Sequence, residues 1–183
     1  MTHSEPRYIW MAISLVLVVS SFFVILIVPY TIHNILFHTM NTAAIQTPKL
    51  VLYMYGISIG MIALASFLMY LNQKKLWKAA LLLTLIGFIG MGLGTDHYKV
   101  VTYDEIKFSK PWSFAETSYE WKDVKEIITE ESDDEAVNWQ VKLLFKDGEE
   151  LVFLRDRRFN SDHANFYSAA KMNGVPYKGI NDK

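Results

Sequence analysis

Residues 50–94 read LVLYMYGISIGMIALASFLMYLNQKKLWKAALLLTLIGFIGMGLG, and this stretch decides the fold. Residues 50–71 and 79–94 contain no Asp, Glu, Lys, Arg or His, and the turn Asn-Gln-Lys-Lys at 72–75 lies between them. Uncharged apolar runs of about 18 residues or more are typical of helices that cross a bilayer. The stretch therefore predicts an antiparallel transmembrane hairpin, with spans at about 50–71 and 77–94.

A third apolar stretch precedes the hairpin. Residues 8–30 are uncharged, and Trp10 and Tyr30 stand where aromatic side chains mark a membrane interface. The apolar core is too long for a secretory signal peptide, and no small-x-small cleavage site follows it. We therefore expect a retained anchor, and an α-helical membrane region of three transmembrane helices over residues 1–95.

The connection between the first two spans, residues 31–49, is polar to mixed in character. Its Ile-Leu-Phe at 35–37 is expected to dip into the membrane interface. His33 and His38 are five positions apart, do not share a helix face and have no nearby carboxylate. We interpret them as ordinary loop histidines in preference to metal ligands.

The positions of Lys and Arg predict the orientation. If the 72–78 turn is cytoplasmic, Arg7 and three lysines lie inside and Lys49 lies outside, which the positive-inside rule favours. We therefore expect a multi-pass protein of the cell membrane, with its N-terminus inside and its C-terminal domain outside.

Small residues recur along one face of each helix of the hairpin. Close backbone approach over such residues is a main source of contact energy between helices in lipid. We favour packing of the three helices within one chain, and a homodimer seam is the alternative. The candidate helix-packing residues are Gly56, Gly60, Ala63, Gly87, Gly90 and Gly94.

Charge divides the chain into two domains. Residues 1–95 hold five basic residues and one acidic residue, whereas residues 96–183 hold 13 basic and 18 acidic residues, a balance of −5. The boundary is therefore expected near 95–96. The acidic balance disfavours nucleic-acid binding, and the absence of cysteine excludes disulfides, thiolate metal sites and cysteine nucleophiles.

Residues 96–183 change to a period of two, which predicts a mostly-β domain. We expect strands at 98–103, 106–109, 117–121, 124–131, 139–145 and 151–154. The last two strands flank Asp147-Gly148, which predicts a hairpin with a type I′ turn. A helix is expected at about 161–173, with Asn160 or Ser161 as its cap, and residues 175–183 are expected to form a tail.

Residues 118–127, SYEWKDVKEI, together with the hairpin at 141–153 and the helix near 161–173, resemble bacterial pleckstrin-homology-like (PH-like) domains of small membrane proteins. The similarity covers residues 98–174. It implies an antiparallel sheet or partial barrel closed by one C-terminal helix, and it brings no catalytic signature. The family fold has seven strands where we count six, so a further strand lies in 111–116 or is missing. A different small antiparallel sheet with a helix is the alternative.

The motifs of catalysis are missing from the sequence. It has no Gly-rich phosphate loop, no Gly-x-Ser-x-Gly and no His-Glu-x-x-His. Ser161, Asp162 and His163 are consecutive and cannot converge as a triad, so we interpret them as a helix cap and first turn. The spans carry no ionisable residue at their centres, which disfavours proton relays and ion-coupled transport. We expect no enzymatic activity, no cofactor and no bound metal.

Two charged clusters remain. The acidic run 130–135 lacks the ligand spacing of a calcium loop and is interpreted as a solvated hairpin tip. Arg155, Arg157 and Arg158 are the candidate contacts for an anionic partner, either lipid headgroups or, for a domain outside the cell, wall polymers. A charged loop that balances nearby acids is the alternative.

These observations favour a membrane-anchored, non-enzymatic interaction module. Its expected partners are the lipid bilayer and an unidentified protein or lipid, and a homo-oligomer is left open. Tethering at a surface raises effective concentration, so weak contacts suffice. Family analogy offers one alternative, an immunity-type protein that protects the cell against a membrane-active peptide. The other is an accessory subunit of a membrane pore or transporter.

Overall fold

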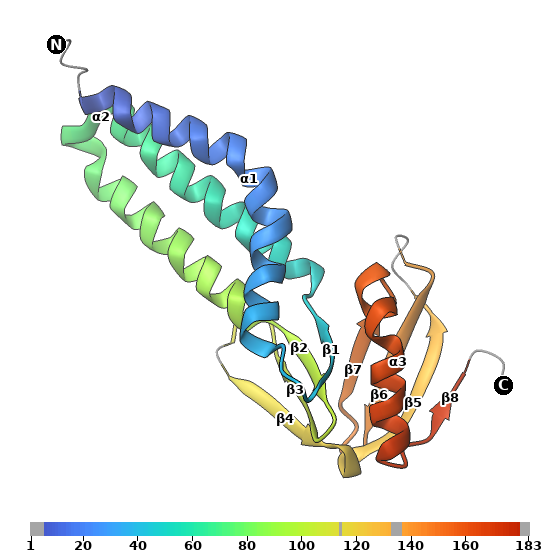
Figure 1. The fold of residues 1–183 in the computed structure, drawn as a ribbon. Coiled ribbons are helices and arrows are strands. Elements are labelled where there is room, and N and C mark those ends of the chain that lie inside the picture. The colour runs from blue at the N-terminus through green and yellow to red at the C-terminus, as the bar shows by residue number, and fades with distance from the viewer. Residues whose placement is uncertain (1–5, 114, 133–136, 180–183) are drawn as a thin grey trace. The chain divides into compact units, whose positions relative to one another are not determined.

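The computed structural model describes residues 6–113, 115–132 and 137–179 (Figure 1). These residues form two compact units. The helical unit holds the chain up to His33, Thr47–His97 and the loop 111–113. The β unit holds Asn34–Gln46, Tyr98–Lys110 and the described residues from Ala115 onward. The chain is therefore a helical N-terminal region followed by a β-rich domain with one C-terminal helix.

The helical unit contains the two described helices that are long and apolar enough to cross a membrane. Helix α1 is Pro6–Phe37 and helix α2 is Lys49–Asp96. Asn72 has non-helical backbone angles (φ −157°, ψ 87°) and divides α2 into a first arm, 49–71, and a second arm, 73–96. Figure 1 shows the two arms running back along each other. The three helices expected from the sequence thus appear as two, the second one broken at the predicted turn.

His33 does not lie in a loop, so that interpretation is wrong. It belongs to α1 and is fully buried. Its Nδ1 lies 2.8 Å from Thr47 Oγ1, and its Nε2 lies 2.9 Å from the backbone oxygen of Thr95. Because a buried polar ring needs partners, these two bonds explain how histidine is tolerated at this helix end. They join α1 to the segments at both ends of α2.

The β unit contains two four-stranded sheets and helix α3 (Figure 1). The first sheet has the order β1-β2-β3-β4, and the second has the order β7-β6-β5-β8. Helix α3, Arg157–Met172, packs against β1 and β2. The strands are β1 (Thr42–Gln46), β2 (Lys99–Thr102), β3 (Glu105–Ser109), β4 (Glu116–Glu120), β5 (Val124–Glu131), β6 (Trp139–Phe145), β7 (Glu150–Leu154) and β8 (Tyr177–Lys178).

All six strands expected after residue 96 are present, and two more come from segments that the sequence assigned otherwise. β1 lies in the supposed connection 31–49 and pairs antiparallel with β2. β8 lies in the supposed tail and pairs parallel with β5. Among the described residues of 111–116, only Glu116 belongs to a strand, as the start of β4. The additional strand of the first sheet is therefore supplied from between the two long apolar helices.

The β6–β7 hairpin is confirmed, but its turn type is not. A type I′ turn needs positive φ at both central residues. Gly148 has φ +92°, whereas Asp147 has no positive φ. The amide of Gly148 donates to the oxygen of Phe145, and the amide of Phe145 donates to the oxygen of Glu149. This pattern is typical of a type I turn followed by a glycine bulge.

The core of the β unit is aromatic and lies between the sheets and α3. Phe153, Phe159 and Phe166 are at most 1% exposed, and their ring centroids lie 5.4–5.9 Å apart. Ala169 and Ala170 are buried on the same helix, and their small side chains let α3 lie close to the β1 backbone. Small alanines beside large aromatic rings thus seat this helix on the core.

Candidate functional site

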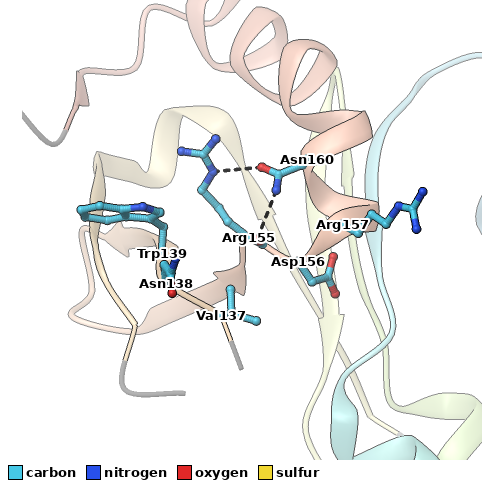
Figure 2. Close-up of a pocket in the computed structure, with 7 residues that line it drawn as sticks. All are labelled: Val137, Asn138, Trp139, Arg155, Asp156, Arg157 and Asn160. Atoms are coloured by element: carbon cyan, nitrogen blue, oxygen red, sulfur yellow. Dashed lines mark hydrogen bonds between the residues drawn. The ribbon is translucent and has the colours of Figure 1, made fainter. Parts of the chain in front are cut away.

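An open pocket of about 350 Å³ lies where β7 ends and α3 begins. We call it the arginine pocket. Figure 2 shows its side chains, which come from the start of β6 and from the β7–α3 junction. It is lined by Val137, Asn138, Trp139, Arg155, Asp156, Arg157 and Asn160.

Backbone bonds at the strand end position the first arginine. The amide of Arg155 donates to the oxygen of Trp139 over 2.9 Å, which extends the β6–β7 pairing by one residue. The Arg155 Nε then donates to Asn160 Oδ1 over 3.2 Å, and Asn160 Nδ2 donates back to the Arg155 oxygen over 3.3 Å. This reciprocal pair fixes the arginine against the first turn of α3 (Figure 2).

Helix α3 begins at Arg157, earlier than the predicted start at 161, because Asp156 is the cap. Its Oδ1 accepts from the amides of Arg158 and Phe159 over 3.0 and 2.8 Å. A carboxylate in this position satisfies two of the unpaired amides at a helix start. The proposed caps Asn160 and Ser161 lie inside the helix, so that prediction is wrong.

The predicted arginines do not act as one cluster. Arg155 and Arg157 line the pocket, and Figure 2 shows their side chains extending in opposite directions. Arg158 is exposed and is not part of the lining. The pocket thus combines one half-buried arginine with a second arginine at its edge.

The sequence did not reveal the remaining lining residues. The alternation of β6 placed Trp139 with the buried residues of the strand, but it is half-buried and faces the pocket. Asn160 appeared as a cap candidate only. The acidic run that precedes Trp139 lies partly outside the described residues, at 133–135. Of its described members, Glu130 pairs with Lys142 at 2.9 Å.

The chemistry of the pocket favours an anionic group that carries an apolar neighbour. A guanidinium recognises carboxylates and phosphates through its fork of N–H donors. The indole of Trp139 and the side chain of Val137 add apolar surface beside it. The one carboxylate of the lining, on Asp156, is engaged by the helix amides.

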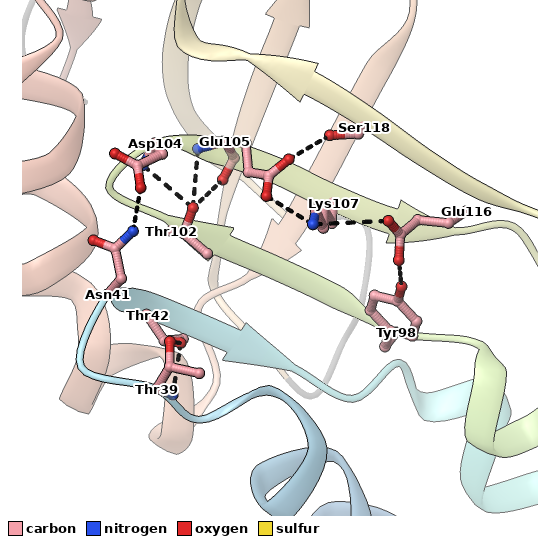
Figure 3. Close-up of polar contacts among 10 residues, drawn as sticks. All are labelled: Thr39, Asn41, Thr42, Tyr98, Thr102, Asp104, Glu105, Lys107, Glu116 and Ser118. Carbon is pink, nitrogen blue, oxygen red and sulfur yellow. Dashed lines mark hydrogen bonds and ion pairs between the residues drawn. The ribbon is translucent and has the colours of Figure 1, made fainter.

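A second polar cluster, on the first sheet, is satisfied within itself (Figure 3). Lys107 Nζ lies 2.7 Å from Glu105 and 3.9 Å from Glu116, while Ser118 Oγ donates to Glu105 over 2.9 Å. Hydrogen bonding to Lys107, then to Ser118, lowers the pKa of Glu105, and the bond to Glu105 raises the pKa of Lys107. Because Lys107 and Glu105 already bond within the cluster, this surface leaves fewer groups available to a charged partner than the arginine pocket does.

The triad residue types near the helix start do not converge. Ser161 Oγ donates to the oxygen of Arg158 one turn earlier. His163 Nε2 lies 3.1 Å from the Tyr177 hydroxyl, which joins α3 to β8. Burial, and then the positive charge of Arg155, lower the pKa of His163. The three residues therefore have separate structural contacts.

The candidate glycines of the second arm lie against the first arm. A Cβ at Gly87 would stand 2.9 Å from the backbone oxygen of Ser58, and one at Gly94 would stand 3.1 Å from the Tyr55 ring. Gly90 also faces the Ser58 side chain. The backbones approach closely here, as small residues permit.

The candidate helix-packing residues of the first arm lie in two environments, against α1 or exposed. A Cβ at Gly56 would lie 3.3 Å from Ile25 of α1, and Ala63 is buried and accepts a 3.0 Å hydrogen bond from Ser14. Gly60, by contrast, is exposed and has nothing within 4 Å of an added Cβ. Small residues on one predicted face therefore serve different contacts.

Within the described ranges 6–113, 115–132 and 137–179, no group of three His, Asp or Glu side chains could hold a metal ion. Comparisons with protein-family models, with curated proteins and with solved structures found no match to this chain.

Proposed function

We propose that this chain is a membrane-anchored, non-enzymatic interaction module whose β unit is PH-like and binds an anionic group of a protein partner. Two packed four-stranded sheets with one closing helix support the PH-like type. The two long apolar helices support the anchor. The observation that carries the binding function is the arginine pocket, in which Arg155 lies beside Trp139.

Strand pairing supports three membrane crossings. β1 ends just before α2 and β2 begins just after it, and the two strands pair from Thr42↔Thr102 to Gln46↔Lys99. Paired strands must lie on the same side of a bilayer, so α2 crosses an even number of times. The break at Asn72 leaves a first arm of roughly 34 Å at 1.5 Å per residue, which is long enough to span the hydrocarbon core. With α1 retained, the total is three.

Binding to the pocket is tested by calorimetry on the full-length chain in neutral detergent, with an oligoglutamate peptide as the probe and oligolysine as the charge control. Arg155→Gln is expected to weaken oligoglutamate binding by at least about tenfold, because a hydrogen bond to a charged group contributes about 1.5–3 kcal/mol. Lys125→Gln is the matched control, since it removes the same charge from an exposed position outside the pocket.

Equal losses in the two variants would show nonspecific attraction and contradict a site at Arg155. Unchanged binding of Arg155→Gln would contradict it as well. The anchor is tested separately by washing membranes with alkaline carbonate, where release of the chain would disprove the membrane location.

A further inference from the structure

The helical unit contains a pocket of its own, which no part of the proposed function uses. Its volume is about 320 Å³, at the lower end of the range of about 300–1,000 Å³ typical of small-molecule sites. It lies between α1 and the two arms of α2. Trp10, Ala65, Ser66, Trp77, Ala80 and Thr84 are among its lining residues. We call it the helix pocket.

The floor of the helix pocket is small and apolar. Ala65, Ser66 and Ala80 are only 2–6% exposed. The two hydroxyl groups of the lining donate into their own helices: Ser66 to the oxygen of Ile62 over 3.0 Å, and Thr84 to the oxygen of Ala80 over 2.9 Å. Their donors are therefore used, and no charged side chain lines the pocket. An occupant meets a hydrocarbon-like surface.

Cationic side chains stand next to this apolar hollow. Trp77 lines the pocket, and the Nζ of Lys78 lies 5.7 Å from the centroid of its ring. Lys74 and Lys75 are exposed in the turn that begins the same arm. Tryptophan and lysine together mark the headgroup level of a bilayer. The pocket thus pairs an apolar hollow with positive charge at one end.

We propose that the helix pocket binds an anionic phospholipid, with one acyl chain in the hollow and the phosphate against Lys78 and Lys75. The complementarity is twofold: hydrocarbon meets the alanine floor, and the negative headgroup meets the lysines. Basic pockets between membrane helices recognise anionic headgroups in this way. The inference rests on the membrane location proposed above, but not on the arginine pocket.

Native mass spectrometry of the full-length chain in neutral detergent tests the proposal. The probes are phosphatidylglycerol and phosphatidylcholine with identical acyl chains. We expect tighter retention of phosphatidylglycerol, and a loss of roughly fivefold per lysine removed, which corresponds to about 1 kcal/mol for each. Lys75→Gln combined with Lys78→Gln should bring its retention near that of phosphatidylcholine. Lys49→Gln, at the opposite end of the first arm, is the control and should change the retention of neither lipid.

The role of the hollow is tested by Ala80→Phe. The larger side chain fills the hollow and should weaken the binding of both lipids. Leu85→Phe is its control, because Leu85 is 51% exposed on the same arm and does not line the pocket. If Ala80→Phe does not fold, the lysine variants decide the result alone.

Three results would overturn the proposal. They are equal retention of the two lipids by the wild type, an equal loss from Lys49→Gln, and a folded Ala80→Phe that keeps full phosphatidylglycerol binding. A lipid-free dimer abolished by Ala80→Phe would assign the hollow to a second copy of the chain. Release of the chain by carbonate would instead refute the membrane location itself. Failure of the lipid pocket and failure of the membrane location are therefore distinguishable.

Discussion

Two polar side chains join the two sheets of the β unit, and neither is conspicuous in the sequence. Gln46 and Lys99 are paired neighbours on β1 and β2. The Gln46 amide donates to the oxygen of Leu154 over 2.7 Å and accepts from its amide over 3.2 Å, so it imitates a strand partner for β7. Lys99 Nζ donates to the oxygen of Val152 and lies 5.8 Å from the centroid of Phe153. This one pair of neighbouring residues thus links the first sheet to β7 of the second sheet.

The charged form of Lys99 reduces the stability of the fold, because burial lowers the pKa of its ammonium group to about 8. Below pH 8 the folded chain holds a desolvated ammonium. Between about pH 8 and 10.5 the folded chain has released this proton while the unfolded chain still holds it, so the contribution of Lys99 to stability rises with pH.

We therefore expect Lys99→Met to raise the free energy of unfolding at pH 7 by about 1–2 kcal/mol. This is less than the full shift implies, because the residue is partly exposed and because the substitution removes its bond to Val152. The gain should shrink toward pH 10.5. Denaturation in detergent, followed by near-ultraviolet circular dichroism, measures both values. Lys107→Met is the control, since the pKa of Lys107 is raised by Glu105. A gain that stays constant from pH 7 to 10.5 would contradict the assignment.

At the scale of elements, the arms of α2 pack through glycines whose neighbours differ. Gly87→Ala would place its Cβ 2.7 Å from Ile62 and 2.9 Å from the backbone oxygen of Ser58, and a backbone atom cannot move aside easily. We expect a loss of about 1–3 kcal/mol of stability, as overpacking produces.

Gly60→Ala is the matched variant, because nothing lies within 4 Å of the added Cβ. It should be neutral or slightly stabilising, since alanine favours a helix over glycine. Unfolding in detergent with increasing sodium dodecyl sulfate compares the two variants. If Gly60→Ala instead lowers the fraction of dimer, the exposed glycine belongs to a seam between copies.

At the scale of the whole molecule, the pairing of β1 with β2 ties membrane topology to the fold. Reporters placed in the 72–75 turn, in the 38–41 loop and after Lys183 should show the turn in the cytoplasm and the other two sites outside. The physical reason is that a strand pair cannot form across a bilayer. Accessibility of single cysteines, added to this cysteine-free chain, measures the same sides without a large fusion.

Reporters on opposite sides for the 38–41 loop and the C-terminus would exclude the β1–β2 pair in the membrane-bound protein. An inverted result, with the turn outside and both other sites inside, would keep the fold and reverse the predicted orientation.

The sequence predicted those elements whose burial is periodic. The runs at 50–71 and 79–94 are helices, and the alternating segments at 139–145 and 151–154 form a hairpin. In both cases the local pattern of apolar residues indicates which faces are buried. The candidate site was predicted only in part. Arg155 and Arg157 were named, but Trp139 and Asn160 join them through the β6–β7 register and the Asp156 cap, which act across distant positions.

The sequence alone determined that an apolar helical region precedes a β-rich domain, since transfer of apolar residues from water depends on composition and period. Only the tertiary structure decided that Thr42–Gln46 is a strand. Its Ala43 and Ala44 have little preference for strands, and they become buried because β2 and α3 offer them a partner and a cover. Which strand and helix a segment packs against depends on residues far away in the sequence, so a local pattern of residues cannot predict it.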